Sequence, residues 1–567
     1  MSHPNLILRN ANVITFDPAR PRARAVAVRG ECIVEVGDDC VAGPDTQVID
    51  LAGATLIPGF NDVHAHMDRE GLKQQRPSLA GARSVADILA VVREAAARLP
   101  TGSWVATMPV GEPPHYLDAL NGIAERRLPT REELDQAAPR HPVYIPGLFG
   151  NWGYPPGYSM LNTRALRLNG ISRDTRPTCP GIDIVRGTDG EPTGAIIERN
   201  ARPAAEFDLL PMVPRFGFDD RLAGLRLSMR LYNAVGTTSI YEGHGVSAET
   251  IAVYRRLWEE DALTVRAGLV VSPSWADAAE ARLAMRDWLA YARGRGLGDP
   301  WLRISGVHIA YGGDATVAAR ARANLPDTGW AGFVEQALTP SDFREACFLA
   351  AEHDLRLHTI VSDKLHEVVP VLEAVNAKFP LAGRRWVIEH VARARIDDLH
   401  TLKRLGIWVT TIPTYFLWKG GHAYMDELDG GDMVVPHRHL LDLGIPLSIA
   451  TDNIPYSPFF TLWVAMARQE RVSGKVIGSG QRLDAMTALR LFTVEGASLT
   501  FDEDWKGPLK PGFAADMAVL SGDPAGASPQ ELKDMRCLKT IVGGRIVHDG
   551  HNSRLSGGFG ASGWNCC

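Results

Sequence analysis

The chain has 567 residues and a formal net charge of −6, and its length predicts one large domain with a smaller one. The charge excludes the basic surface of a nucleic-acid-binding protein, and there is no apolar run of membrane length. Seven cysteines are too few for a disulfide framework in so long a chain, and the first residues lack the pattern of a secretory signal. We therefore expect a soluble protein of the cytoplasm.

The first 57 residues contain short β-type runs separated by Gly, Asp and Pro, which predict a small antiparallel sheet. They read LILRNANVITF, AVAVRGECIVEVG and QVIDLAGATLIPGF. The same pattern returns within residues 505–550, in ADMAVLSGDP and LKTIVGGRIVHDG. We expect the two ends of the chain to form one β-sandwich domain. Residues 551–567, which are rich in Gly and Ser, predict a disordered tail, and a metal-binding role for its Cys566 and Cys567 is disfavoured.

Residues 58–504 alternate short apolar runs with helical segments, which is typical of a parallel sheet with helical crossovers. Seven such runs follow residue 236 and another precedes His64, so we expect a (β/α)8 barrel. The seven are TTSIYEG, LTVRAGLVV, LRISGVHIAYGG, LRLHTIV, RRWVIEH, GIWVTTIP and IPLSIATDN. The segment from about 69 to 218 is too long for a loop. It predicts an inserted lobe over the barrel mouth, either covering substrate or simply packing there.

Residue types that favour a helix start or a helix end mark two of the helical segments. In SDFREACFLAAEH the apolar residues share one face and Ser341 is a suitable N-cap. In DDLHTLKRLG the leucines do the same, and Gly406 is expected to end the helix.

Histidine and aspartate residues stand where apolar runs stop. His64 and His66 are two residues apart, so they face the same way if the strand continues through them. His358, His390 and Asp452 end or follow later runs. The carboxyl ends of barrel strands meet at one face, and imidazole with carboxylate suits Zn²⁺, Fe²⁺, Mn²⁺ or Co²⁺. The pattern predicts a divalent metal site, although any one residue alone could simply be hydrogen-bonded at a strand end.

Longer motifs resemble the amidohydrolase superfamily, specifically its branch of N-substituted formamide deformylases. In the order of that branch, the motifs are LIPGFNDVHAHM, LPTREELDQAAPRHPVYI, LNTRALRLNGI, DGEPTGAIIE, VIEH, TDN, TALRLFTVEGA, GPLKPGFAADMAVLSGDP and TIVGGRIV. The resemblance spans about residues 5–550 and implies a metal-dependent hydrolase with a (β/α)8 barrel and a β-sandwich. By motif position it implies the metal ligands His64, His66, His358, His390 and Asp452.

The chain departs from this branch at His308, in GVHIAYGGDAT, where the branch carries a lysine whose carbamate bridges two metals. Imidazole forms no carbamate, so we favour one metal, most simply Zn²⁺. Its ligands would be His64, His66, His358 and Asp452, with His308 and His390 either supporting those ligands or facing the substrate. In the alternative, His308 and His390 help to hold a second metal. A histidine that the branch often places before Asn162 is also missing, so the substrate or its orientation is expected to differ.

The resemblance also implies a mechanism in which Asp452 is the general base for a metal-activated water and returns the proton to the leaving nitrogen. His390, if it is not a ligand, would stabilise the oxyanion, and His308 is a further catalytic candidate. Glu242, near the mouth, either supplies negative charge, binds substrate or merely ends its strand. His244 beside it is given no role.

We expect hydrolysis of an amide-type C–N bond in a small molecule, and the alternatives are deamination and a metal-free binding or scaffold function. Deaminases of the superfamily usually carry a glutamate three residues after the strand-five histidine, where this chain has Val361. A metal-free binding or scaffold protein would have little reason to keep the other ligand positions. Aromatic residues near the mouth suit an aromatic or N-substituted substrate, and a homodimer is a base-rate expectation. These aromatic residues are Trp152, Tyr154, Tyr158, Tyr415, Phe416, Trp418 and Tyr456.

Overall fold

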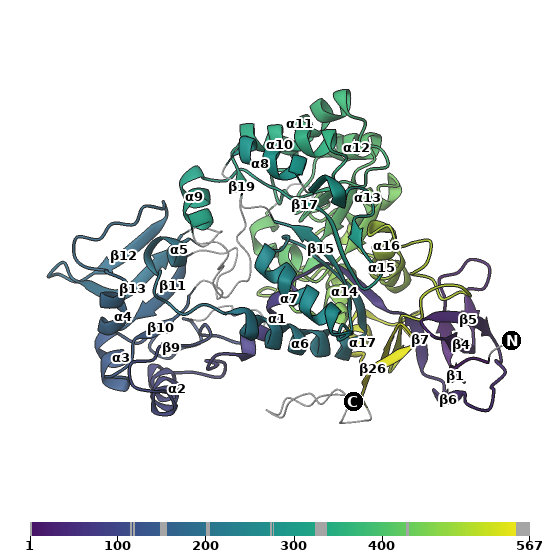
Figure 1. The fold of residues 1–567 in the computed structure, drawn as a ribbon, viewed down its shortest axis with the longest axis horizontal. Helices are drawn as coiled ribbons and strands as arrows, with labels where there is room; N and C mark the ends of the chain where they lie inside the picture. The colour runs from purple at the N-terminus through teal and green to yellow at the C-terminus, as the bar shows by residue number, and fades with distance from the viewer. Residues whose placement is uncertain are drawn as a thin grey trace.

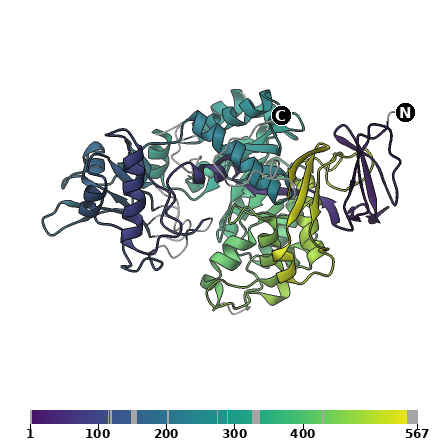
Figure 2. The ribbon, with the colours of Figure 1, turned by 90° about the horizontal axis from the view of Figure 1, so that it is seen from below.

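The computed structural model of the protein describes residues 3–550 apart from 114–115, 117–119, 148–155, 200–203, 273–274, 276, 288, 324–336 and 427–429. The predicted tail, Trp152 and Tyr154 lie outside the described residues. Figures 1 and 2 show a central barrel, with a lobe at one end of the long axis and the sheets formed by the chain ends at the other.

Eight parallel strands form the central sheet, and they follow one another around it in chain order. They are β8 (Phe60–Ala65), β14 (Thr237–Glu242), β15 (Arg266–Val271), β17 (Leu302–His308), β20 (Leu357–Ile360), β21 (Val387–Glu389), β22 (Trp408–Thr411) and β23 (Leu447–Ile449). The last strand returns to the first, because the backbone N–H of Thr451 donates to Asp62 Oδ1 at 3.1 Å. The structure confirms the predicted (β/α)8 barrel.

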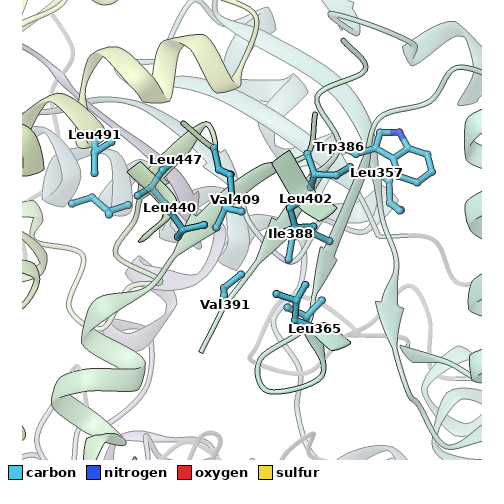
Figure 3. Close-up of a cluster of buried hydrophobic side chains, with 14 of the residues drawn as sticks. Leu357, Leu365, Trp386, Ile388, Val391, Leu402, Val409, Leu440, Leu447 and Leu491 are labelled. Carbon is cyan, nitrogen blue, oxygen red and sulfur yellow. The ribbon is translucent and has the colours of Figure 1, made fainter. Parts of the chain in front are cut away.

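Helices cover the outside of the barrel. They are α6 (Phe218–Ala234), α7 (Ala248–Glu259), α8 (Ala278–Asp287), α10 (Pro340–Glu352), α11 (Leu365–Lys378), α12 (Ile396–Leu405), α13 (His437–Asp442), α14 (Pro458–Ala467), α15 (Ala485–Phe492) and α16 (Val494–Leu499). Figure 3 shows Leu402 of α12 and Leu440 of α13 beside Ile388 and Val409 of the strands. No described helix is long and apolar enough to cross a membrane.

Helix ends follow local chemistry. Gly406 ends α12 in the left-handed conformation at φ 69°, as predicted, because glycine adopts it without a steric penalty. The prediction of Ser341 as the N-cap of α10 is wrong by two residues. Thr339 caps the helix by accepting from the backbone N–H of Asp342, and Pro340 suits the first turn because its ring fixes φ.

The two ends of the chain share a sheet. The six-stranded sheet has the order β26 (Arg545–Asp549), β25 (Cys537–Val542), β24 (Met517–Leu520), β7 (Thr55–Pro58), β2 (Asn12–Ile14), β3 (Arg22–Ala23). A four-stranded sheet has the order β5 (Cys32–Gly37), β4 (Ala25–Arg29), β1 (Leu6–Arg9), β6 (Gln47–Asp50). Leu8, Val26 and Leu56 share one hydrophobic core with Met517 and Val519, which supports our proposal that residues 1–57 and 505–550 form one domain.

The prediction of an antiparallel sheet for the N-terminal region is wrong in part. β1 runs parallel to β6, and β2 runs parallel to β7. Each pair joins strands that are distant in sequence, so the chain between them must return to the starting end of the first strand before the second strand begins. Short β-type runs with turn residues between them do not distinguish a crossover from a hairpin.

The lobe has a five-stranded sheet of its own, in the order β12 (Ile182–Arg186), β13 (Pro192–Glu198), β11 (Gly157–Leu161), β10 (Val143–Ile145), β9 (Val105–Ala106). Helix α9 (Ala315–Ala323), which follows barrel strand β17, reaches it: Arg320 Nε donates to Thr178 Oγ1 at 2.8 Å. Because α9 lies beyond the carboxyl end of β17, this contact supports our proposal that residues from about 69 to 218 stand at the barrel mouth. Asn162 has a structural role in the lobe, where its Oδ1 caps α4 (Thr163–Leu168).

A buried ion pair joins the opposite end of the barrel to the sheet of the chain ends. Arg266, at the start of β15, donates from Nε to Asp516 Oδ2 at 2.8 Å and from Nη2 to Asp516 Oδ1 at 3.2 Å. The two side chains are 3% and 4% exposed. We predict that Asp516→Ala costs about 3 kcal/mol of stability, because it leaves the guanidinium buried without its carboxylate. The measurement is the urea midpoint of unfolding.

Glu345→Ala is the matched control, because it removes the exposed Arg282–Glu345 pair, whose side chains are 54% and 51% exposed. That change is expected to cost at most about 1 kcal/mol. Equal midpoints for the two variants would contradict a structural role for the buried pair.

Candidate metal centre

The first barrel strand brings two histidines to the mouth. Every residue of β8 is buried and His64 lies within it, whereas His66 comes one residue after its end, at the N-cap position of α1 (Met67–Glu70). The two imidazole rings lie 5.3 Å apart, with 84° between their planes. The strand therefore does not continue through both histidines, which the alternation of side chains along a strand would require. The chain after Ala65 nevertheless keeps the His66 ring beside the His64 ring.

The end of the last strand is bonded to these histidines. The backbone N–H of Asp452 donates to His64 O at 3.0 Å. Asn453 Oδ1 accepts from the backbone N–H of His66 at 3.0 Å, and its Nδ2 donates to His66 O at 2.8 Å. Asp452 and Asn453 have φ of 53° and 54°, a conformation that aspartate and asparagine adopt more readily than most residues. The Thr-Asp-Asn motif thus fixes the first strand's histidines to Asp452.

Four of the predicted residues converge here. His66 Nε2 lies 2.8 Å from Asp452 Oδ1, and His64 Nε2 lies 3.7 Å from the same oxygen. His390, directly after β21, has its Nε2 3.0 Å from His64 Nε2 and 3.8 Å from Asp452 Oδ2. All four side chains are buried. Ligand atoms of a tetrahedral zinc site lie roughly 3.4 Å apart, so this arrangement fits a divalent ion.

The other two predicted histidines surround a buried glutamate instead. His358 donates from Nδ1 to Glu389 Oε1 at 2.8 Å, and its ring stacks on Tyr241 at 4.8 Å. His308, the last residue of β17, has Nε2 3.9 Å from Glu389 Oε2. Glu389 Oε1 also lies 3.5 Å from His64 Nδ1. The carboxylate of Glu389 therefore lies within 4 Å of His64, which belongs to the converging group, and of His308 and His358.

His244, which the sequence analysis left without a role, lies in this centre. Ligand atoms of His64, His244, His390 and Asp452 all lie within 4.8 Å of one another. The sequence feature that could have identified His244 is the glycine on each side of it, in Glu-Gly-His-Gly. This pattern marks a tight turn immediately after a strand.

Glu242 belongs to a neighbouring group. Its Oε1 accepts from the backbone N–H of Asp68 at 3.0 Å and from the Tyr254 hydroxyl. Burial, followed by the charge of Asp68, raises the pKa of Glu242 well above its ordinary value. Ligand atoms of His66, Asp68 and Glu242 also lie within 4.8 Å of one another, so this glutamate borders the centre through His66.

The amidohydrolase family profile matches residues 47–548. The chain belongs to the amidohydrolase family. It is 26% identical to the N-substituted formamide deformylase of Arthrobacter pascens, over 96% of this chain and 98% of that relative. It is 24% identical to the putative amidohydrolase YtcJ of Bacillus subtilis, over 89% of this chain and 91% of that relative. Its fold is similar to that of an uncharacterized metal-dependent hydrolase of Pyrococcus horikoshii, with a TM-score of 0.66 and 20% identity over 93% and 99% of the two chains.

The family confirms the predicted enzyme class. The amidohydrolase is a hydrolase that acts on carbon–nitrogen bonds, as the motifs around His64, His390 and Asp452 indicated.

Burial controls the charge of the candidate ligands. It lowers the pKa of His64 to about 3 and holds the pKa values of His66, His244 and His390 well below their ordinary value. At neutral pH these imidazoles are therefore uncharged, which is the form that binds a metal.

Asp452 has the opposite shift. Burial raises its pKa to about 8, while the nearby charges of Arg69 and Lys419 act in the other direction. Its Oδ2 is buried and has no hydrogen-bond partner among the described residues. A cation beside this carboxyl group would favour its ionised form, so the amidohydrolase has an acid group at the centre that suits a bound metal.

An aromatic wall stands beside His390. The π-helix η3 (Thr414–Lys419) follows strand β22 and presents Tyr415 and Phe416, whose rings lie 6.0 Å and 5.8 Å from that of His390. Trp418 and Tyr456, in contrast, pack on Phe460 and Tyr232, and Tyr158 lies in β11 of the lobe. Of the predicted aromatic residues, Tyr415 and Phe416 are the two that these contacts place against the centre.

We predict that Glu389→Gln lowers metal affinity about 10- to 100-fold with the fold retained. Glutamine keeps the shape and can still accept from His358, but it removes the negative charge beside His64, and carboxylates that orient metal-bound histidines contribute on this scale. Affinity is measured by competition with a chelator. Glu345→Gln, on the surface, serves as the control, and equal affinities for the two variants would contradict a role for Glu389 in holding the centre.

Proposed function

We propose that this amidohydrolase hydrolyses the amide-type C–N bond of a small N-substituted molecule at a divalent metal, with Asp452 as the general base. The observation that carries the proposal is the buried group of His64, His66, His390 and Asp452 at the carboxyl end of the barrel. The N-substituted formamide deformylase of Arthrobacter pascens, similar over nearly the full length of both chains, supports the substrate class.

The residues present fit the metal. We propose that His64, His66, His390 and Asp452 hold one ion, most simply Zn²⁺, since neutral imidazoles and one carboxylate are its common ligands. In place of a bridging lysine the chain has His308, whose Nε2 lies 3.9 Å from Glu389 Oε2, while His64 Nδ1 lies 3.5 Å from Glu389 Oε1. This arrangement supports one metal rather than a carbamate-bridged pair.

A divalent metal supplies a water of lowered pKa and polarises a carbonyl oxygen. Asp452, through its Oδ2, accepts a proton from that water and then donates it to the nitrogen of the leaving amine. The imidazole of His308 is buried near His244, with their rings 6.0 Å apart, and is proposed to help hold the substrate carbonyl. Tyr415 and Phe416 would pack against the substituent on nitrogen.

Two further proposals concern the protein as a whole. The described cysteines are free thiols, which supports the cytoplasmic location predicted from the sequence; they are Cys32, Cys40, Cys179, Cys347 and Cys537. A homodimer stays a prediction.

The direct test is a screen of N-substituted formamides and related amides, with the parent enzyme and with Asp452→Asn. We expect the parent to release amine, to lose activity with a chelator and to regain it with Zn²⁺. Asp452→Asn should lose at least ~100-fold in rate, because asparagine keeps the shape but cannot accept the proton.

Asp397→Asn, on the surface of α12, is the control for the same chemical change. The proposal fails if Asp452→Asn keeps near-parent activity, or if the parent is equally active after complete removal of metal. Circular dichroism of both variants checks that the fold is retained.

His308→Ala is expected to lower the rate at least ~10-fold, equivalent to about 1.4 kcal/mol in the barrier. The imidazole is buried at the end of the fourth strand, with Glu389 and His244 beside it, so its loss removes a polar group next to the centre. His400→Ala, an exposed histidine of α12, is the matched control. An unchanged rate would show that His308 only fills space.

His308→Lys separates the one-metal and two-metal versions. We expect low activity and one bound ion per chain even with added bicarbonate, because the surrounding residues are arranged around an imidazole. Two ions per chain at the parent's rate would instead indicate an ordinary binuclear site.

A further inference from the structure

The geometry points to Lys419, in the π-helix η3 after the seventh barrel strand, as the residue that binds a carboxylate of the substrate. The inference deepens the proposed function and rests on it for the place of the scissile amide. It makes the substrate an N-acyl amino acid, in which the substituent on the amide nitrogen carries a carboxylate. Hydrolysis adds the hydroxyl of water to the acyl carbon and its proton to the nitrogen, and it releases a carboxylic acid and an amino acid.

Lys419 is a buried cation at the mouth of the barrel. The residue is 3% exposed, and lysine is rarely buried to this degree because its ammonium group loses hydration. It is the last residue of η3, which follows strand β22 at the carboxyl end of the central sheet. An ammonium group in this place suits an anionic ligand, because the attraction between opposite charges is stronger where water is excluded.

The side chain of Lys419 lies beside the aromatic wall of the metal centre. Its Nζ is 5.2 Å from the centroid of the Tyr415 ring, and residues three or four apart on a helix are neighbours. The rings of Tyr415 and Phe416 lie 6.0 Å and 5.8 Å from that of His390. The ammonium group is therefore next to the two rings that are proposed to pack against the substituent on nitrogen.

Lys419 and Asp452 act on each other's charge. Burial lowers the pKa of Lys419 to about 7, and the charge of Asp452 acts in the opposite direction. The charge of Lys419 in turn acts against the burial that raises the pKa of Asp452 to about 8. A carboxylate bound beside Lys419 would favour its charged form. The lysine is thus close enough to the proposed general base for one small substrate to contact both.

The backbone on both sides of Lys419 is held by hydrogen bonds. Gly420 N–H donates to Tyr415 O at 2.9 Å, five residues back, which is the bond of a π-turn. Arg471 N–H donates to Trp418 O at 3.1 Å. Turns of this type occur frequently at functional sites, and a fixed backbone positions the lysine for specific recognition.

Arg69 is the competing cation, because its charge also acts on Asp452. It follows the histidines of the first strand, and its Nε lies 3.5 Å from Asp68 Oδ1. A carboxylate of the protein therefore stands beside this guanidinium, which makes it the weaker candidate for a substrate anion. The experiment separates the two cations by removing the charge of Lys419 alone.

The test measures equilibrium binding to the zinc-loaded full-length enzyme by calorimetry. The probes are N-methanesulfonylphenylalanine, a sulfonamide analogue that is not hydrolysed, and its uncharged carboxamide. We expect the parent to bind the carboxylate at least ~10-fold more tightly than the carboxamide, because a hydrogen bond between two charged groups is strong. Lys419→Met keeps the length of the side chain and removes its charge, so it should bind the two probes within about threefold of each other.

Lys378→Met, on the surface of α11, is the matched control and should keep the parent's preference. Melting curves check the fold, and Lys419→Gln replaces Lys419→Met if the latter is unstable. The inference is overturned if the parent binds neither probe or shows no preference. It is also overturned if the Lys419 variants keep the preference, which would assign the carboxylate to the metal or to Arg69.

The binding result does not depend on turnover. If neutral formamides react and the probes show no preference, the inference fails and the proposed function stands. If the preference disappears with Lys419 but no amide is hydrolysed, the proposed function fails and Lys419 is supported as the binding residue for a carboxylate.

Discussion

The junction between the first and last barrel strands is the constraint on which the site depends. Asp62 accepts from Thr451, and Asp452 N–H donates to His64 O, so closing the barrel also places the aspartate against the histidines. Asn453 satisfies both backbone groups of His66 where β8 has already ended. These buried bonds tolerate little displacement, because an unpaired donor or acceptor there would cost about 1–3 kcal/mol. The left-handed backbone of Asp452 is strain of the kind often found at functional sites.

The centre gathers polar groups that would be costly to bury apart. Desolvation keeps its histidines neutral and raises the pKa of Asp452, so a metal-free centre has uncharged imidazoles and a carboxyl group that favours its proton. A divalent ion changes this balance, since it attracts imidazole lone pairs and favours the carboxylate. Glu389 supplies a second buried negative charge between His64, His308 and His358. The arrangement therefore makes physical sense as a site built around a cation.

The sequence predicted the barrel because its strands are short apolar runs at regular intervals, and it predicted the mouth because polar residues end those runs. The sequence predicted less about the direction in which each side chain points. His358 and His390 end neighbouring strands in the same way, yet one faces Glu389 and the other faces His64. The difference lies in local backbone geometry, with φ of +56° at His390, which hydrophobic periodicity does not report. His244 was missed because it stands two residues beyond its strand, where the spacing argument ends and the flanking glycines decide the position.

The most direct test of this account is a crystal structure of the zinc-loaded enzyme, with the ion located by anomalous scattering at the zinc edge. The account predicts one strong peak per chain, in contact with His64, His66, His390 and Asp452. A peak that contacts neither Asp452 nor the histidines of the first strand, or two peaks bridged through the fourth strand at His308, would contradict it.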